Sequence, residues 1–162
     1  MGVLYLICWR RNYPQATGTR PTSMILLDTD HLSLLQVRDA PAAFALHTRL
    51  EASPDAVVTT VITLEEQMRG WLALLHRIPE VSRQVAYYER LLGLVGFFAA
   101  WEVLPFDQRA AATFAQLRQQ GVRIGTMDLK IAAIALEHQA LVLQGNRRNF
   151  QIHRPDPHTL LS

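Results

Sequence analysis

Two hydrophobic patterns alternate along this chain, one typical of buried strands and one typical of helices. Unbroken apolar or β-branched runs predict strands at residues 24–27, 56–60, 102–105 and 140–143. Apolar residues at helical spacing predict helices at residues 30–36, 41–51, 63–76, 79–101, 107–120 and 126–139. Strands separated by helices imply crossover connections and a parallel sheet. The expected fold class is therefore α/β, with a central parallel sheet flanked by helices.

Capping residues suggest where several helices begin. Asp30 has the side chain of an N-cap for the first short helix, and Asp107 has it for a later one. Thr63 and Glu66 have the spacing of a capping box. Pro41 suits the first position of a helix, where its missing N–H costs nothing.

The first 23 residues differ from the rest, because proline, glycine, threonine and serine interrupt them without a periodic apolar pattern. We expect residues 1–23 to form a poorly ordered extension and residues 24–162 to form one domain. Met24 then becomes a candidate for the natural first residue, a hypothesis that N-terminal sequencing of the native protein tests.

Composition narrows the class of protein. Of 162 residues, 49% are hydrophobic and 19% charged, which suits one domain with a real core. A net charge of +2 permits nucleic-acid binding without identifying it, although all the basic residues but Lys130 are arginines, which suit phosphate contacts. A single cysteine, Cys8, excludes an internal disulfide. Neither a secretory signal nor a bilayer-spanning stretch is evident, so we expect a cytoplasmic protein without a membrane partner.

Three carboxylates occupy comparable positions in the predicted elements. Asp28 ends the first strand, Glu66 lies in the first turn of the helix after the second strand, and Asp128 lies in the first turn of the last helix. In a parallel sheet these points face one edge, where ligands of α/β proteins gather. Carboxylates at close range repel one another unless a cation lies between them, and Mg²⁺ or Mn²⁺ prefers such oxygen ligands. The three acids together predict a metal site.

Each acid taken singly also has a structural explanation. Glu66 fits the capping box, Asp30 fits an N-cap, and Asp128 fits the helix dipole, an effect of about 0.3–1 kcal/mol. Thr29 fits two roles equally, orienting a carboxylate or water and starting a helix. The histidines show no metal-ligand spacing and are assigned to surface or packing, and Ser33 has no histidine and acid to activate it.

Three segments resemble the PIN-domain nucleases, specifically the VapC toxins of bacterial toxin–antitoxin pairs. They are LLDTDHLS at residues 26–33, TLEEQMRG at residues 63–70 and DLKIAAIA at residues 128–135. The second segment matches Thr-x-x-Glu-x-x-x-Gly and selects Glu66 over Glu65. Over about residues 24–150 the motifs follow the family's order, which implies a PIN-like three-layer sandwich.

The C-terminal part departs from the family pattern. The segment LQGNRRNF at residues 143–150 has Gln144 where the family has threonine, and Asn146 and Asn149 where it has acids. Asn146 remains a candidate fourth ligand that binds a cation more weakly than a carboxylate does. Arg147, Arg148 and the more distant Arg123 are candidate phosphate contacts, with solvated surface as the alternative.

The resemblance implies an Mg²⁺-dependent endoribonuclease in which Asp28, Glu66 and Asp128 hold the ion. It also implies an RNA substrate, a homodimer and a cognate antitoxin. One alternative is a catalytically weakened PIN domain that binds antitoxin or RNA without cleavage. Another is a haloacid-dehalogenase-like phosphatase, in which Asp28 is the nucleophile and Asp30 the general acid. That class also needs a later lysine and a further acidic pair, whereas Lys130 lies two residues after Asp128 on the same helix and no acidic pair follows it.

Overall fold

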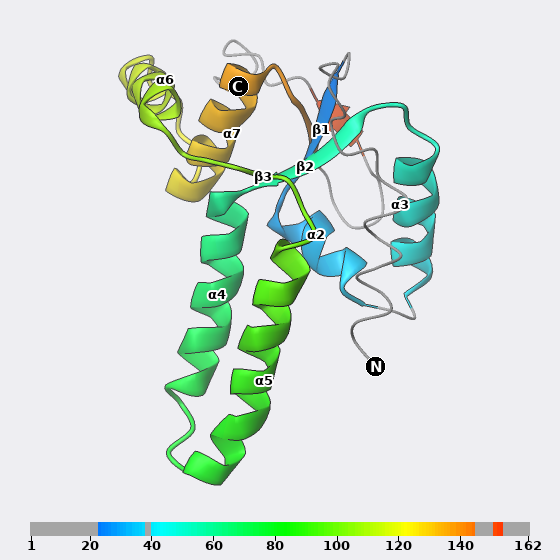
Figure 1. Ribbon diagram of the computed structural model, residues 1–162. Helices are drawn as coiled ribbons and strands as arrows, with labels where there is room; N and C mark the ends of the chain where they lie inside the picture. Colours follow the sequence, from blue (N-terminus) through cyan, green and yellow to red (C-terminus); the bar gives the residue numbers. More distant parts are fainter. Residues whose placement is uncertain (1–22, 38–39, 145–150, 154–162) are drawn as a thin grey trace.

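A five-stranded sheet in the order β3-β2-β1-β4-β5 forms the centre of the molecule (Figure 1). This computed structural model describes residues 23–37, 40–144 and 151–153. The strands are β1 (Met24–Leu27), β2 (Ala56–Thr60), β3 (Val103–Leu104), β4 (Leu141–Gln144) and β5 (Gln151–His153). The first four are mutually parallel, as the sequence predicts, and β5 adds antiparallel to β4. The pattern did not predict β5, because three residues with one apolar side chain carry no strand signal.

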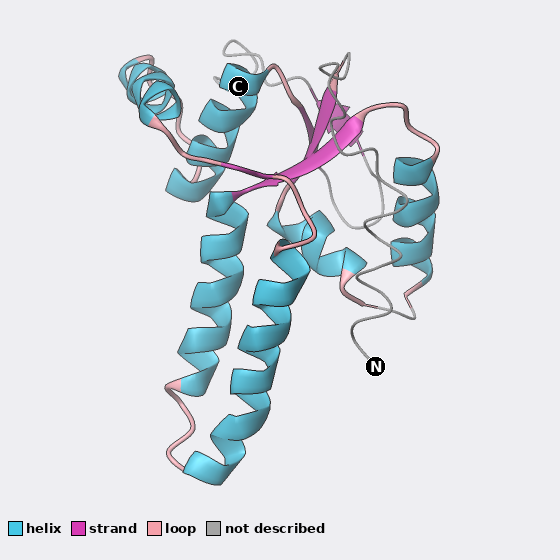
Figure 2. Cartoon of the chain, viewed as in Figure 1, coloured by secondary structure: helices cyan, strands magenta, loops and turns pink. Residues whose placement is uncertain are grey.

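Six helices connect the strands, and Figure 2 shows that helix outweighs strand. They are α2 (Thr29–Leu35), α3 (Pro41–Glu51), α4 (Val61–Leu75), α5 (Val81–Phe98), α6 (Gln108–Gln119) and α7 (Thr126–His138). Five lie within about two residues of the predicted ranges. The expected helix at residues 79–101 is shorter at both ends, because Glu80 is the N-cap of α5 and the backbone turns at Ala99.

Helices cover both faces of the sheet, which confirms the three-layer sandwich. From β1, Ile25 and Leu27 enter a core cluster that includes Leu32 of α2 and Leu94 of α5. Leu26 points to the opposite face. There it joins a second cluster whose helical members come from α4, α6 and α7. Because β1 is buried on both faces, all four of its residues are apolar.

Two helices begin earlier than their capping signals suggest. Asp28 is the N-cap of α2, because its side chain accepts a hydrogen bond from the backbone N–H of His31, and Asp30 lies in the first turn. Thr60 is the N-cap of α4, and its hydroxyl accepts from the backbone N–H of Thr63. The expected caps Asp30 and Thr63 were therefore wrong, because each strand passes into its helix without a connecting loop. Asp107 caps α6 as predicted.

Helices α4 and α5 form an antiparallel hairpin that extends away from the sheet (Figure 1). Trp71 of α4 contacts two residues of α5. Its ring lies edge-on to the Tyr87 ring, with 6.5 Å between the ring centres, and its ring centre lies 5.1 Å from the Arg90 guanidinium carbon. Within the described residues, no helix combines the length and the apolar character needed to cross a membrane.

Candidate active site

The carboxyl end of β1 lies at the point where the chain reverses its direction across the sheet. After β1 the chain adds β2 and β3 on one side, and it then returns to add β4 on the other. Adjacent crossovers on opposite sides leave a crevice at the carboxyl ends of the strands, which is the usual ligand site of open α/β sheets. Asp28 follows β1 directly at this switch point.

Asp28 is held by two donors from one residue. The backbone N–H of His31 donates to Asp28 Oδ1 at 2.9 Å, and the ring Nδ1 of His31 lies 2.6 Å from the same oxygen. His31 is 2% exposed, whereas the Asp28 side chain is 22% exposed. The carboxylate is therefore anchored from the protein side and open on the other side.

Glu66 comes to the same edge through a bond to the residue after Asp28. The hydroxyl of Thr29 donates to Glu66 Oε2, and Thr29 is also the first residue of α2, so the structure contains both roles expected for it. A second polar contact follows one turn along, where Gln67 Nε2 donates to Ser33 Oγ at 3.2 Å. Gln36 completes the row by donating to Gln67 Oε1 at 2.8 Å. This row of side chains fixes α2 against α4 and sets Glu66 beside the end of β1.

The neighbouring acid on α4 faces elsewhere. Glu65 pairs with Arg69 one turn along the same helix, and both side chains are largely exposed. Of the two adjacent glutamates, Glu66 is therefore the one directed to the edge of the sheet, in agreement with the selection made from the motif.

Asp128 lies in the first turn of α7, at the end of that helix nearest α4 (Figure 1). Ile62 of α4 and Ile131 of α7 share one core cluster, so the beginnings of the two helices are fixed relative to each other. The exposed Asp128 side chain folds back over Gly125, where a Cβ would lie only 2.7 Å from Asp128 Oδ2. The glycine leaves the room that this carboxylate occupies.

The three acids lie at the same edge of the sheet, but their carboxylates are not close enough together to form a metal site. In the part of the chain that the structure describes, no three His, Cys, Asp or Glu side chains are grouped closely enough to hold a metal ion. Asp28 and Glu66 each accept a hydrogen bond from a protein donor. Their chemistry nevertheless fits a hard cation, because Asp28 and Glu66 are partly open to solvent and Asp128 is exposed.

The sequence pattern does not predict three participants in the site. His31 has no metal-ligand spacing, and its contact with Asp28 depends on the turn of α2. Ser33 lacks the partners of a nucleophile, and no motif marks Gln67. The available signal is the helical spacing of Thr29, Ser33 and Gln36, which forms one polar face.

The remaining candidates lie elsewhere. Asn146, Asn149, Arg147 and Arg148 lie outside the described residues. Arg123 is exposed and precedes α7.

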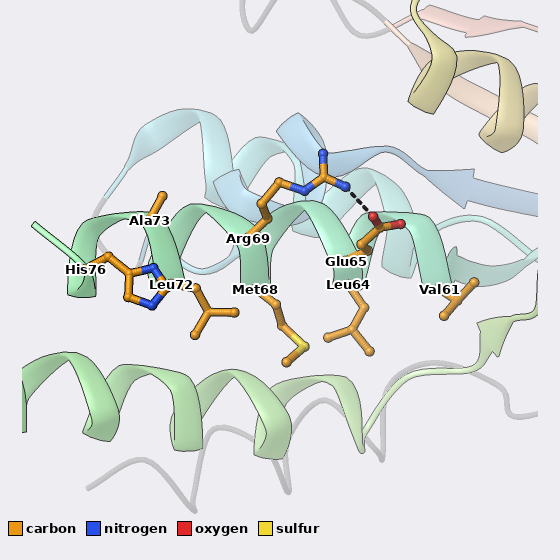
Figure 3. Close-up of a pocket in the computed structure, with 8 residues that line it drawn as sticks. All are labelled: Val61, Leu64, Glu65, Met68, Arg69, Leu72, Ala73 and His76. Atoms are coloured by element: carbon orange, nitrogen blue, oxygen red, sulfur yellow. Dashed lines mark hydrogen bonds and ion pairs between the residues drawn. The ribbon is translucent and has the colours of Figure 1, made fainter.

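A separate apolar groove of about 590 Å³ runs along α4 (Figure 3). In that view Leu64, Met68 and Leu72 project toward α5, whereas Arg69 and Ala73 point away from it. The lining is almost wholly apolar and includes neither Asp28 nor Glu66. This surface suits contact with another macromolecule better than chemistry.

Comparison with known proteins places the chain in one family. The PIN domain family matches residues 25–153. FitAcB from Neisseria gonorrhoeae is 29% identical, with a TM-score of 0.53 over 74% of this chain and 85% of that one. No curated protein matches the sequence.

Two further solved structures establish the fold alone, because their identity to this chain is low. Promoter-DNA-bound VapBC2 from Rickettsia felis is 19% identical, with a TM-score of 0.52 over 76% of this chain and 87% of that one. DNA-bound VapBC from Salmonella typhimurium is 21% identical, with a TM-score of 0.52 over 82% of this chain and 96% of that one. Together with the family match, these structures confirm the PIN-like fold.

Proposed function

The chain belongs to the PIN domain family, and from that premise we propose that it is a metal-dependent endoribonuclease, the toxin of a VapBC-type toxin–antitoxin pair. The observation that carries the proposal is the bond from Thr29 to Glu66, which brings Glu66 to the residue that follows Asp28 at the switch point of the sheet. We further propose that the protein acts in the cytoplasm.

In this proposal Asp28, Glu66 and Asp128 hold Mg²⁺ or Mn²⁺, directly or through water, and Asn146 supplies a weaker fourth ligand. When bound, the ion would polarise a phosphodiester and make water a better nucleophile. The protein's own part is to orient the carboxylates. His31 and Thr29 fix one oxygen each on Asp28 and Glu66, which leaves the other oxygens for the ion.

The RNA would approach across the open edge of the sheet. Arg123 is exposed two residues before Gly125 and the start of α7, and a guanidinium there suits a phosphate next to the acids. Arg147 and Arg148 are further candidates from the segment after β4. We propose that these arginines position the backbone of the substrate.

We propose a cognate antitoxin and a second copy of the chain as protein partners. Support comes from the α4/α5 hairpin, on which Val81, Val85, Tyr88, Leu92 and Val95 are all more than half exposed. Their spacing of four, three, four and three residues is that of a helix-packing seam. Met68 and Leu72 of the α4 groove add apolar surface on the neighbouring helix.

The phosphatase alternative finds little support in the geometry around Lys130. That class requires a lysine at the nucleophile, whereas the described contact of Lys130 Nζ is with the Phe106 ring, 5.7 Å from its centre. The weakened-toxin alternative draws on the unclosed acidic set and on the asparagines at positions 146 and 149. Both are outcomes of the following test.

Antitoxin-free protein is incubated with structured RNA and with a phosphomonoester, in Mg²⁺ and in EDTA. We expect metal-dependent RNA cleavage. We expect Asp28→Asn, Glu66→Gln and Asp128→Asn each to lose more than about 100-fold in rate, since even outer-shell partners of metal ligands contribute about 10- to 100-fold. Glu65→Gln is the matched control, because Glu65 pairs with Arg69 away from the site, and its rate should not change.

Other outcomes would replace this function. RNA bound tightly but uncut in Mg²⁺ would indicate the weakened toxin. Release of phosphate from the monoester would indicate the phosphatase. Equal losses in Glu65→Gln and Glu66→Gln would contradict the assignment of Glu66.

A further inference from the structure

We propose that His31 is a positioning residue for Asp28, fixing one carboxylate oxygen so that the other stays directed to a divalent cation. This inference rests on the proposed function, since it concerns the same site. It adds a residue that lies outside the three acidic positions and that no metal-ligand spacing in the sequence picks out.

The contact is a two-point anchor on a single oxygen. Backbone N and ring Nδ1 of His31 lie 2.9 and 2.6 Å from Asp28 Oδ1. A carboxylate oxygen can only accept, so Nδ1 carries a hydrogen in this contact whether the ring is neutral or charged. Two donors converging on Oδ1 fix the rotation of the carboxylate about its last side-chain bond. A backbone donor alone would leave this rotation freer.

The other oxygen of Asp28 is left available. Within the described residues no hydrogen bond reaches Oδ2, and the side chain is 22% exposed. Two residues before His31, Thr29 does the same for Glu66 by donating to Oε2. The first turn of α2 therefore sets two acids at once, with one oxygen of each held by the protein.

Helix capping alone does not explain a histidine at this position. The backbone N–H of His31 already provides the N-cap bond of α2. The His31 ring lies 98% buried beside the apolar Leu32, and a polar ring at such a site costs free energy unless it is hydrogen-bonded. The contact between ring Nδ1 and Asp28 Oδ1 supplies such a bond, so the ring acts on Asp28 in addition to filling its place in the packing.

The test measures metal binding separately from activity. Isothermal titration of MnCl₂ into antitoxin-free full-length protein gives the dissociation constant, and thermal melting gives stability. His31→Leu keeps apolar volume and removes the donor, whereas His31→Asn keeps an N–H donor close to the place of Nδ1. Leu32→Val is the matched control, because Leu32 is fully buried in the same turn and has no polar atom to offer Asp28.

We expect His31→Leu to weaken Mn²⁺ binding about 10- to 100-fold, the range typical of outer-shell partners. His31→Asn should recover most of that loss, and Leu32→Val should lower the melting temperature without weakening Mn²⁺ binding. Unchanged affinity in His31→Leu, or an equal loss in Leu32→Val, would overturn this inference and leave the nuclease intact. A parent protein that binds no Mn²⁺ would overturn the proposed function together with it.

Discussion

At the scale of single residues, Asp28 combines two roles that the sequence pattern assigns to two residues, the cap to Asp30 and the acid at the strand end to Asp28. It caps α2 through the N–H of His31, and it stands at the carboxyl end of β1 as the first of the three acids. A carboxylate at a helix start also interacts favourably with the helix dipole. The capping explanation and the catalytic proposal are therefore compatible for the same side chain.

Gly125 provides a prediction about Asp128. Its backbone angles, φ −53° and ψ 144°, are open to alanine, so only the side chain of Asp128 would meet the new Cβ. Gly125→Ala should turn the Asp128 carboxylate and slow RNA cleavage by about 10- to 100-fold, the cost of a misplacement near 1 Å. Initial cleavage rates in Mg²⁺ check this.

Gly93→Ala is the control for that substitution, because a Cβ on Gly93 of α5 meets nothing within 4 Å. Its cleavage rate should not change, and its unfolding free energy should rise by about 0.5–1 kcal/mol, because alanine favours a helix interior over glycine. An unchanged rate in Gly125→Ala would show that the position of the Asp128 carboxylate does not limit the reaction.

At the scale of elements, α4 has a polar face that contacts α2 and a separate apolar face that lines a groove. Toward α2 it presents the polar pair Glu66 and Gln67, which set the candidate site. Another face carries the apolar groove with Met68 and Leu72 (Figure 3). A partner bound at this groove would therefore contact the helix that carries Glu66, which is a direct physical route by which an antitoxin could affect the acids.

The seam on α5 leads to a prediction about assembly. Leu92 is 73% exposed in the middle of this stripe, so Leu92→Lys should weaken self-association or antitoxin binding. Burying a leucine contributes about 1.5–3 kcal/mol, which corresponds to roughly a 10- to 100-fold change in the dissociation constant. Sedimentation velocity over a range of concentrations, with and without antitoxin, measures the effect.

Phe44→Lys serves as the matched control for α5, since Phe44 is 76% exposed on α3, a different helix. We expect this variant to associate like the parent. Equal weakening in both variants, or a parent that neither self-associates nor binds antitoxin, would remove α5 as the interface.

At the scale of the whole molecule, strand order decides which residues meet. Placing β1 between β2 and β4 brings the helix starts after β1 and β2 to the edge where α7 also begins. The residues on either side of the sheet, such as Leu26 and Leu27, pack into separate cores that hold this arrangement. The two cores therefore hold the strand ends and helix starts that carry the acids.

The domain boundary is tested by shortening the chain. Ser23 should be kept, because its carbonyl accepts from Ala56 N–H at the start of β2. Removing residues 1–22 should leave RNA cleavage unchanged and shift the melting temperature by less than about 3 °C, the equivalent of 1 kcal/mol for a chain of this size. A larger fall, or lost cleavage, would show that the first 22 residues belong to the domain.

Local patterning predicted most of the fold. The strands and helices follow from apolar runs and spacing, and the capping residue Asp107 is correct because its signal is contained in four consecutive residues. Asp30 and Thr63 were misassigned as caps because two of the strands pass straight into helices, a junction that propensity does not reveal. The strand β5 was missed because its pairing with β4, rather than its composition, creates it.

By itself the sequence determined the element order, the two-sided burial of β1 and the candidates Asp28, Glu66 and Asp128, because each depends on neighbours within a few residues. Only the tertiary structure decided that Thr29 holds Glu66, that Ser33 and Gln67 join α2 to α4, and that the His31 ring anchors Asp28. The bonds of Thr29 and Ser33 cross more than thirty residues, and that of His31 depends on a buried helical turn. Such contacts arise from packing: the local pattern can show a polar face on α2, but not which side chains that face meets.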